Sequence, residues 1–199
     1  HPEGLEIVKE LAKISDVVVE NYSLGTIERM GLGYDVMRQL NPSIIMCSVK
    51  GYGQTGPYAS RPALDYVIQA TAGVMDNTGE PGGPPQFPGQ AFADDLTAVH
   101  SFGTICAALY HRRDTGVGQY LDMAMQDCLV ALGDHSLHFY LHGRDQGEFE
   151  VESKRRGRWW LHHAVMGCFR GKDGWLVVVA LSDDAFGRLM RGIGREDLL

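Results

Sequence analysis

Short runs of β-branched residues alternate with amphipathic stretches along the N-terminal part of the chain. Residues 3–14 place apolar side chains at helical spacing, and residues 16–20 (DVVVE) form a run typical of a strand buried on both faces. Residues 43–49 (SIIMCSV) repeat that run after two short helical stretches that end at Asn41-Pro42. Strand, helix and strand at this spacing predict βαβ units, and therefore an α/β fold with a Rossmann-like parallel sheet.

The middle of the chain reads as further helices joined by loops that are rich in Gly and Pro. We predict loops at 50–62 and 74–90, helices at 63–72 and 95–112, and a strand at 119–125 that leads into a helix ending near His142. The second loop is long for a compact domain, and loops of this length are often functional.

The C-terminal part differs in character. A polar and charged stretch at 143–158 reads as a linker, and a β-hairpin is predicted around Lys172-Asp173-Gly174, with a helix starting at Ser182. The expected organisation is a large Rossmann-like domain over 1–125, a crossing helix and linker over 126–150, and the start of a smaller α+β domain over 151–199.

Composition narrows the function classes. The 199 residues carry a net charge of -7, which argues against a surface that attracts nucleic acid or an anionic membrane. No apolar run approaches the ~20 residues that cross a bilayer, and no signal peptide is visible, so a cytoplasmic location is expected.

The four cysteines lack CxxC spacing and are expected to be free and buried: Cys47, Cys106, Cys128 and Cys168. The chain opens inside a helical pattern without Met, which suggests a fragment of a longer protein.

Asp94 and Asp95 begin the helix that follows the long loop. Asp in a first helical turn commonly caps the helix by accepting its unpaired N–H groups. The same helix end would also keep a carboxylate ionised, as a nucleophile requires. Both roles fit together if Asp95 caps the helix and Asp94 faces a cleft.

Three other residue patterns are candidates for dinucleotide, metal and phosphate sites. Residues 51–56 match GxGxxG after a strand, but Pro57 follows and no helix opens there, so a tight turn is favoured over a dinucleotide site. His135, His138 and His142 share a helix face, yet no second element supplies ligands, so no metal site is expected. Three basic residues near the strand ends are each typical of a solvated surface, but together would suit phosphates: Arg29, Lys50 and Arg61.

Several stretches together resemble the family III (CaiB/BaiF) CoA-transferases. The matching segments are DVVVENYSLGTIERMGLGYDVMRQLNPSIIMCSVKGYGQTGPY, RPALDYVIQATAGVMDNTGEPGGPP and FADDLTAVHSFGTICAALYHRRDTGVGQYLDMAM. The resemblance is strong to about residue 130 and weaker over 150–199. Family members are roughly twice as long and form interlocked homodimers, so the resemblance implies such a dimer for the whole protein.

The resemblance also implies roles for particular residues. The nucleophilic aspartate of the family lies eighteen residues before the Arg of the ALYHR segment, which corresponds to Asp94 when counted from Arg112. Asn21 and Tyr22 match the loop that contacts CoA, and Arg29 matches a basic residue at the CoA nucleotide. Lys50 and Arg61 fall at or beside CoA-contacting positions. Ser23 to Gly25 depart from the usual rPG, so the Pro that stiffens this loop is absent.

These roles imply CoA transfer between an acyl-CoA and a small carboxylic acid through an aspartyl mixed anhydride, with no metal. The resemblance implies that racemases of the same family carry His, a proton-transfer base, at the position directly before Asp65. This chain has Leu64 at that position, so transfer is favoured over isomerisation. A CoA-binding module without catalysis is the remaining alternative.

Overall fold

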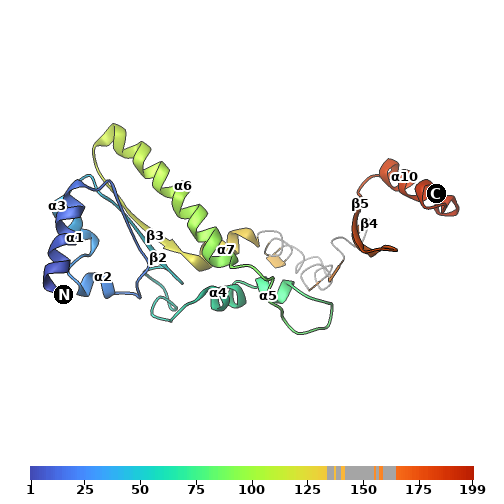
Figure 1. Cartoon of the computed structure of the whole chain (residues 1–199), viewed down its shortest axis with the longest axis horizontal. Helices are drawn as coiled ribbons and strands as arrows, with labels where there is room; N and C mark the ends of the chain where they lie inside the picture. The colour runs from blue at the N-terminus through green and yellow to red at the C-terminus, as the bar shows by residue number, and fades with distance from the viewer. Residues whose placement is uncertain (134–136, 138–139, 142–154, 156, 159–164) are drawn as a thin grey trace. The chain divides into compact units, whose positions relative to one another are not determined.

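The computed structural model describes residues 1–133, 137, 140–141, 155, 157–158 and 165–199, which form two compact units (Figure 1). Unit 1 contains His1–Val74 and Gly89–Asp134, and unit 2 contains Met75–Pro88 and His135–Leu199. Unit 1 therefore continues past residue 125, and part of the long Gly/Pro loop belongs to unit 2. Each unit is described separately below.

A parallel sheet forms the centre of unit 1, as the βαβ pattern predicted. Its described strands are β1 (Val17–Glu20), β2 (Ile45–Lys50) and β3 (Tyr120–Ala124), in the order β1-β2-β3. β2 is almost entirely buried because strands flank it on both edges and helices cover both faces. The register pairs Glu20 of β1 with Ser48 of β2, which brings the carboxyl ends of these strands together.

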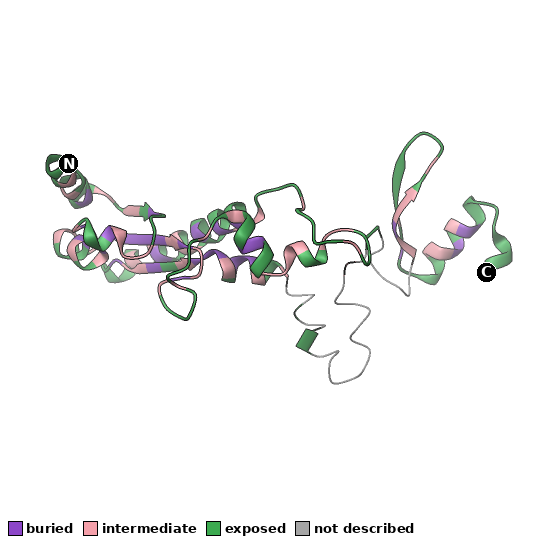
Figure 2. Cartoon of the chain, turned by 90° about the horizontal axis from the view of Figure 1, so that it is seen from below, coloured by how far each residue is buried: buried purple, intermediate pink, exposed green. Residues whose placement is uncertain are grey.

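Alternate residues of β2 face two different helix layers. Ile44, just before the strand, and Met46 pack against α1 (Pro2–Ile14), α2 (Thr26–Arg29) and α3 (Tyr34–Leu40). Ile45 and Cys47 pack against Ala108 of α6 (Phe92–Thr115) on the opposite face. Buried residues accordingly gather along the sheet and on the helix faces toward it (Figure 2). This two-faced covering explains why β1 and β2 read as continuous apolar runs.

Helix α6 spans 24 residues, starting before and ending after the predicted stretch at 95–112. Its C-terminus is closed by Gly116, whose φ of 72° is a conformation that glycine adopts without strain. The Arg112 guanidinium donates hydrogen bonds to Asp16 Oδ1 (2.7 Å) and to the Ser43 carbonyl oxygen (3.1 Å). These bonds fix the last turns of α6 against the amino ends of β1 and β2.

The remaining helices of unit 1 form a smaller cluster beside the N-terminus of α6. α4 (Asp65–Thr71) and α7 (Met125–Leu132) bury Ile68 and Leu129 against Ala93 of α6. The predicted loop at 74–90 opens with a short helix that was not expected, α5 (Val74–Asn77), which begins at the last residue of this part of unit 1 and continues into unit 2. Most of the predicted helix between Leu132 and His142, including the three histidines, lies outside the described residues.

Unit 2 contains the predicted hairpin and helix. β4 (Val165–Arg170) and β5 (Trp175–Ala180) pair antiparallel, and α10 (Asp183–Gly192) and the short 3₁₀ helix η1 (Glu196–Leu198) follow. A further Gly-Pro segment, in which the amide of Gln86 donates to the carbonyl oxygen of Met75, belongs to the same unit. None of the described helices is long and apolar enough to cross a bilayer.

Ser182 caps α10, as the sequence predicted, because its Oγ accepts a hydrogen bond from the amide of Ala185 (3.2 Å). We expect Ser182→Ala to destabilise this helix by about 1 kcal/mol, since the amide then loses its acceptor. Hydrogen exchange of the first-turn amides of α10 would measure the loss. Unchanged protection at Ala185 would contradict the prediction, and Ser182→Asp should restore it.

The cysteine prediction is only partly correct. Cys47 and Cys128 are buried and Cys168 is half-buried, but Cys106 is exposed on α6. The apolar run TICAAL lies on a helix whose outer face is uncovered in this chain, so an apolar neighbourhood in sequence did not imply burial.

Candidate active site

A cavity of about 940 Å³ opens in unit 1 where the parallel strands reach their carboxyl ends. In α/β sheets this edge is where ligands usually bind. The residues after β1 and at the end of β2 form one wall, the loop at 59–64 forms another, and the first half of α6 forms the third. From α6 the lining side chains recur at helical spacing: Asp94, Thr97, Ala98, Ser101, Phe102 and Ile105.

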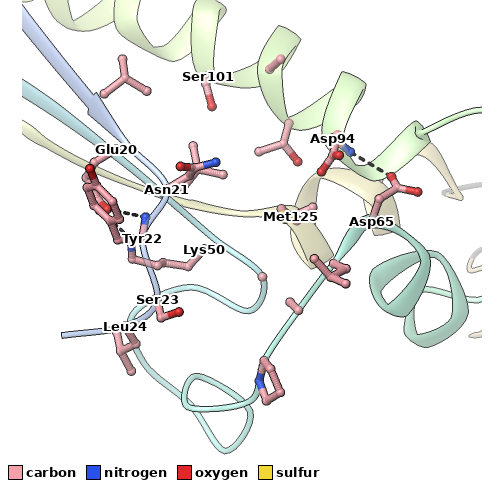
Figure 3. A pocket seen from close by; sticks show the side chains of 18 of the residues that line it. Glu20, Asn21, Tyr22, Ser23, Leu24, Lys50, Asp65, Asp94, Ser101 and Met125 are labelled. Atoms are coloured by element: carbon pink, nitrogen blue, oxygen red, sulfur yellow. Dashed lines mark hydrogen bonds and ion pairs between the residues drawn. The ribbon is translucent and has the colours of Figure 1, made fainter. Parts of the chain in front are cut away.

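Asp94 stands in the first turn of α6 and lines this cavity (Figure 3). Its side chain is exposed rather than packed in the core. Asn21 directly follows β1, and Lys50 is the last residue of β2. Both line the same cavity from the opposite wall. The structure therefore brings the predicted nucleophile and two of the predicted CoA-contacting residues to one cavity.

The cap of α6 does not come from Asp95, which corrects the expectation from the sequence. The N-cap residue is Ala91, which has no side-chain acceptor. The Oδ1 atom of Asp65 instead accepts hydrogen bonds from the amides of Ala93 (2.8 Å) and Asp94 (3.1 Å). Asp65 is the first residue of α4, so one helix caps another across the site (Figure 3).

The electrostatic environment of Asp94 has opposing parts. Partial desolvation at the cavity wall raises the pKa of the Asp94 carboxyl above its ordinary value, and the nearby carboxylates of Asp65 and Asp95 raise it further. The N-terminus of α6 acts in the other direction, because its unpaired amides favour negative charge. The sequence indicated only the effect of the helix end on this carboxylate, and the structure adds the effects of its neighbours, Asp65 and Asp95.

Lys50 is not the solvated surface charge that its position in the sequence indicated. Its side chain is 5% exposed, and its Nζ lies 2.5 Å from Oε1 of Glu20, which is 3% exposed. Glu20 also accepts hydrogen bonds from the Ser48 hydroxyl and from the amide of Tyr22 (2.9 Å). The pair thus links the ends of β1 and β2 and fixes the start of the loop that carries Asn21 and Tyr22.

The other predicted CoA contacts divide into two groups. Tyr22 and Arg61 both line the cavity, and the Arg61 guanidinium lies over the Tyr58 ring at 3.8 Å from its centroid. Arg29 is exposed on α2, is absent from the described lining of the cavity, and donates to Thr26 Oγ1 at 2.7 Å. Its contact with a nucleotide stays a prediction.

Three residues of the site escaped the sequence reasoning: Glu20, Asp65 and Ser101. Glu20 ends a predicted buried strand, and a charged residue is rarely buried without a partner of opposite charge. The sequence could therefore have indicated that Glu20 is paired. Ser101 is buried on the cavity face of α6, where its hydroxyl lies beside the Cys47 thiol. Burial raises the pKa of the neighbouring Cys47 thiol, and the Ser101 hydroxyl offsets part of that effect.

Gly51 shapes the floor of the cavity through close packing. A Cβ on Gly51 would stand 2.1 Å from the Cβ of Ala63, so the turn after β2 tolerates only glycine where it packs against the loop at 59–64. No described helix opens after the GxGxxG-like stretch, and residues 51–64 form bends and turns. A dinucleotide site of the Rossmann type needs a helix N-terminus at that point.

The parallel sheet, the cavity at its carboxyl edge and the aspartate at a helix N-terminus define an α/β protein with a ligand-sized cavity at the end of its sheet. The profile of CoA-transferase family III matches residues 1–199, and the chain belongs to this family.

Similar proteins support the same membership. The chain is 38% identical over 204 residues to the succinyl-CoA–L-malate CoA-transferase beta subunit of Chloroflexus aurantiacus, covering 100% of this chain and 48% of that protein. It is 37% identical over 200 residues to succinyl-CoA:glutarate CoA-transferase of Homo sapiens, covering 100% of this chain and 44% of that protein. The crystal structure of a CaiB/BaiF family protein from Brucella suis superposes with a TM-score of 0.83 at 36% identity, covering 98% of this chain and 50% of that one.

The chain spans about half the length of the curated relatives that it matches. The α/β fold with a parallel sheet, predicted from the residue pattern, is confirmed by the structure and by its CaiB/BaiF neighbour. The predicted family is confirmed over the whole chain.

Proposed function

We propose that the complete enzyme containing this chain transfers CoA from an acyl-CoA to a free carboxylic acid, with Asp94 as the covalent nucleophile. The observation that carries the proposal is the exposed position of Asp94 in a cavity shared with Asn21, Tyr22, Lys50 and Arg61. The cavity offers a carboxylate at one wall and polar groups at the other, at the sheet edge where ligands bind. We further propose that the enzyme is an interlocked homodimer, as the resemblance to the family implies.

The proposed chemistry conserves the acyl group and the thiolate at each step. An oxygen of Asp94 attacks the thioester carbonyl, the C–S bond breaks, and CoA thiolate leaves a mixed anhydride on Asp94. The thiolate attacks the Asp94 carbonyl of this anhydride, which releases the donor acid and leaves an aspartyl-CoA thioester. The acceptor carboxylate displaces the thiolate, and the thiolate then takes the acceptor acyl group from the new anhydride. Asp94 is thereby regenerated.

Water must be kept from these intermediates, since anhydrides hydrolyse. The apolar lining of the cavity by Leu64, Phe102, Ile105 and Met125 favours this exclusion. The donor and acceptor are proposed to be short-chain acids, because the names of the relatives refer to succinyl-CoA with malate or glutarate.

Isomerisation is less well supported by the site. An α-carbon racemase needs a base, and the residue before Asp65 is Leu64, whose exposed side chain at the cavity wall has no proton acceptor. Incubation in deuterium oxide without an acceptor acid would distinguish the two reactions, because only a racemase exchanges the α-proton of the acyl-CoA.

The direct test is transfer of an oxygen label. The complete enzyme is incubated with succinyl-CoA and glutarate labelled with ¹⁸O in its carboxylates, and peptides are analysed by mass spectrometry. The mechanism predicts ¹⁸O in the peptide that contains Asp94, because the acceptor oxygen that bridges the anhydride remains on the aspartate when the thiolate takes the acyl group. Peptides of an Asp94→Asn control should carry none. Turnover without label at Asp94 would exclude the aspartyl route.

A further inference from the structure

Asp65 connects two elements that are distant in sequence but adjacent at the site. Its Oδ1 atom accepts the amide hydrogens of Ala93 and Asp94, so both donors come from the first turn of α6. The amide of Asp94 belongs to the same residue as the proposed nucleophile. Movement of the Asp65 carboxylate would therefore move the backbone from which the Asp94 side chain extends.

The Asp65 carboxylate is itself held in place by a buried amide. Its Oδ2 accepts a hydrogen bond from Nε2 of Gln69 (2.5 Å), one turn further along α4. Gln69 is fully buried, and the same Nε2 donates to the carbonyl oxygen of Gln90 (2.8 Å), in the loop that leads into α6. Asp65 and Gln69 together fix both the first turn of α6 and the segment that precedes it.

An ordinary helix cap would come from the residue before the helix. Here Ala91 occupies that position and offers no acceptor, so the cap comes from a residue 26 positions earlier (91 − 65). A local Ser, Thr or Asn would satisfy the same amides. Capping from α4 has a consequence that a local cap lacks, because it places a second carboxylate beside Asp94.

We propose that Asp65 is a positioning residue for Asp94: it fixes the nucleophile through its backbone amide and sets the charge around it. This inference rests on the proposed role of Asp94. The hydrogen bonds and the negative charge of Asp65 are separable effects. The first requires only an acceptor oxygen, whereas the second requires an ionised carboxylate.

The charge effect has a definite sign. Partial desolvation, Asp65 and Asp95 raise the pKa of Asp94, and the other charged groups lining the cavity are Glu20, Lys50 and Arg61. Glu20 and Lys50 form a pair that largely cancels at a distance. Since Asp94 must be ionised to attack, kcat/KM falls on the acid side as Asp94 becomes protonated. Removing the charge of Asp65 should shift this acid limb to lower pH.

The experiment compares Asp65→Asn, Asp65→Ala and Asp95→Asn in the complete enzyme, with kcat, KM and the pH profile of kcat/KM measured for succinyl-CoA and glutarate. Asp65→Ala should lower kcat by about 10²-fold with little change in KM, because displacement of a reacting group by ~1 Å costs that much. Asp65→Asn keeps an acceptor for the two amides but turns an N–H donor toward Nε2 of Gln69, so it should recover only part of kcat. Its acid limb should still move to lower pH. Asp95→Asn is the matched control, because it removes a nearby charge but no bond to the Asp94 amide.

Two results would overturn the inference: wild-type kcat in Asp65→Ala, or an unmoved acid limb in Asp65→Asn. If Asp65→Ala does not fold, the pH profile of Asp65→Asn decides alone. Asp94→Asn is assayed in parallel to separate the two proposals. Full turnover in Asp94→Asn would reject the nucleophile, whereas an inactive Asp94→Asn beside a fully active Asp65→Ala would reject only the positioning role.

Discussion

Asp94→Asn in the complete enzyme is expected to abolish CoA transfer, lowering kcat by about 10⁴-fold or more, as loss of a covalent nucleophile does in other enzymes. The asparagine side chain has nearly the same size but cannot form the anhydride. CoA binding should persist, because the amide does not alter Asn21, Lys50 or Arg61 at the other walls of the cavity. Calorimetric titration with CoA and a transfer assay with succinyl-CoA and glutarate would measure both properties.

The control for Asp94→Asn is a comparison of its thermal stability with that of wild type as a function of pH, which shows whether the variant is folded. The pKa of Asp94 is raised in the folded protein, so ionisation of this carboxyl is less favourable in the fold than in the unfolded chain. Wild type should therefore lose stability relative to Asp94→Asn as pH rises through the raised pKa. The two proteins should unfold alike at more acid pH, where the carboxyl is protonated in both states. A clearly lower Tm of Asp94→Asn at pH 7 would mean that lost activity reflects misfolding.

Lys50→Met is expected to lower the free energy of unfolding by about 3–5 kcal/mol, since removing one partner of a buried pair leaves the other charge uncompensated. Glu20 would then be buried with only the hydrogen bonds from Ser48 and Tyr22. The start of the Asn21–Tyr22 loop would lose its anchor, so CoA affinity should fall as well. Chemical denaturation followed by circular dichroism would measure the stability.

Lys13→Met provides a matched control. Lys13 also lies 2.5 Å from a carboxylate oxygen, that of Glu10, but this pair is exposed on α1. Exposed pairs contribute only about 0–1 kcal/mol, so Lys13→Met should change stability little. Equal losses in the two variants would show that burial is not what makes the Lys50 pair important. The double variant Glu20→Leu/Lys50→Met should recover part of the loss, because it removes the uncompensated charge.

The sequence predicted the features of the fold that depend on local pattern. The runs VVVE and IMCSVK become β1 and β2 because both faces of the sheet are covered, and Ser182 caps α10 within its own turn. The start of α6 was placed too late and its cap assigned to Asp95. The true cap, Asp65, lies on another helix and leaves no local signal.

In the candidate site, too, the sequence predicted local features and missed contacts between residues that are distant in the chain. Lys50 read as a surface charge because its partner Glu20 is 30 positions away in the chain. Only the parallel register, which sets Glu20 opposite Ser48, brings the two together. The assignment of Asp94 came from family resemblance, because residue types alone favoured a capping role for the Asp94-Asp95 pair. The structure adds the exposure of Asp94 to the cavity.

The length of α6 has a consequence for how this chain can vary. Asp94 near its start and Arg112 near its end are 18 residues apart (112 − 94), which at about 3.6 residues per turn is close to five whole turns. Both side chains therefore leave the helix on the same side, one toward the cavity and one toward the far ends of β1 and β2. Inserting one residue between them would rotate one relative to the other by about 100°. Insertions and deletions between these two positions should accordingly be rare among functional homologues.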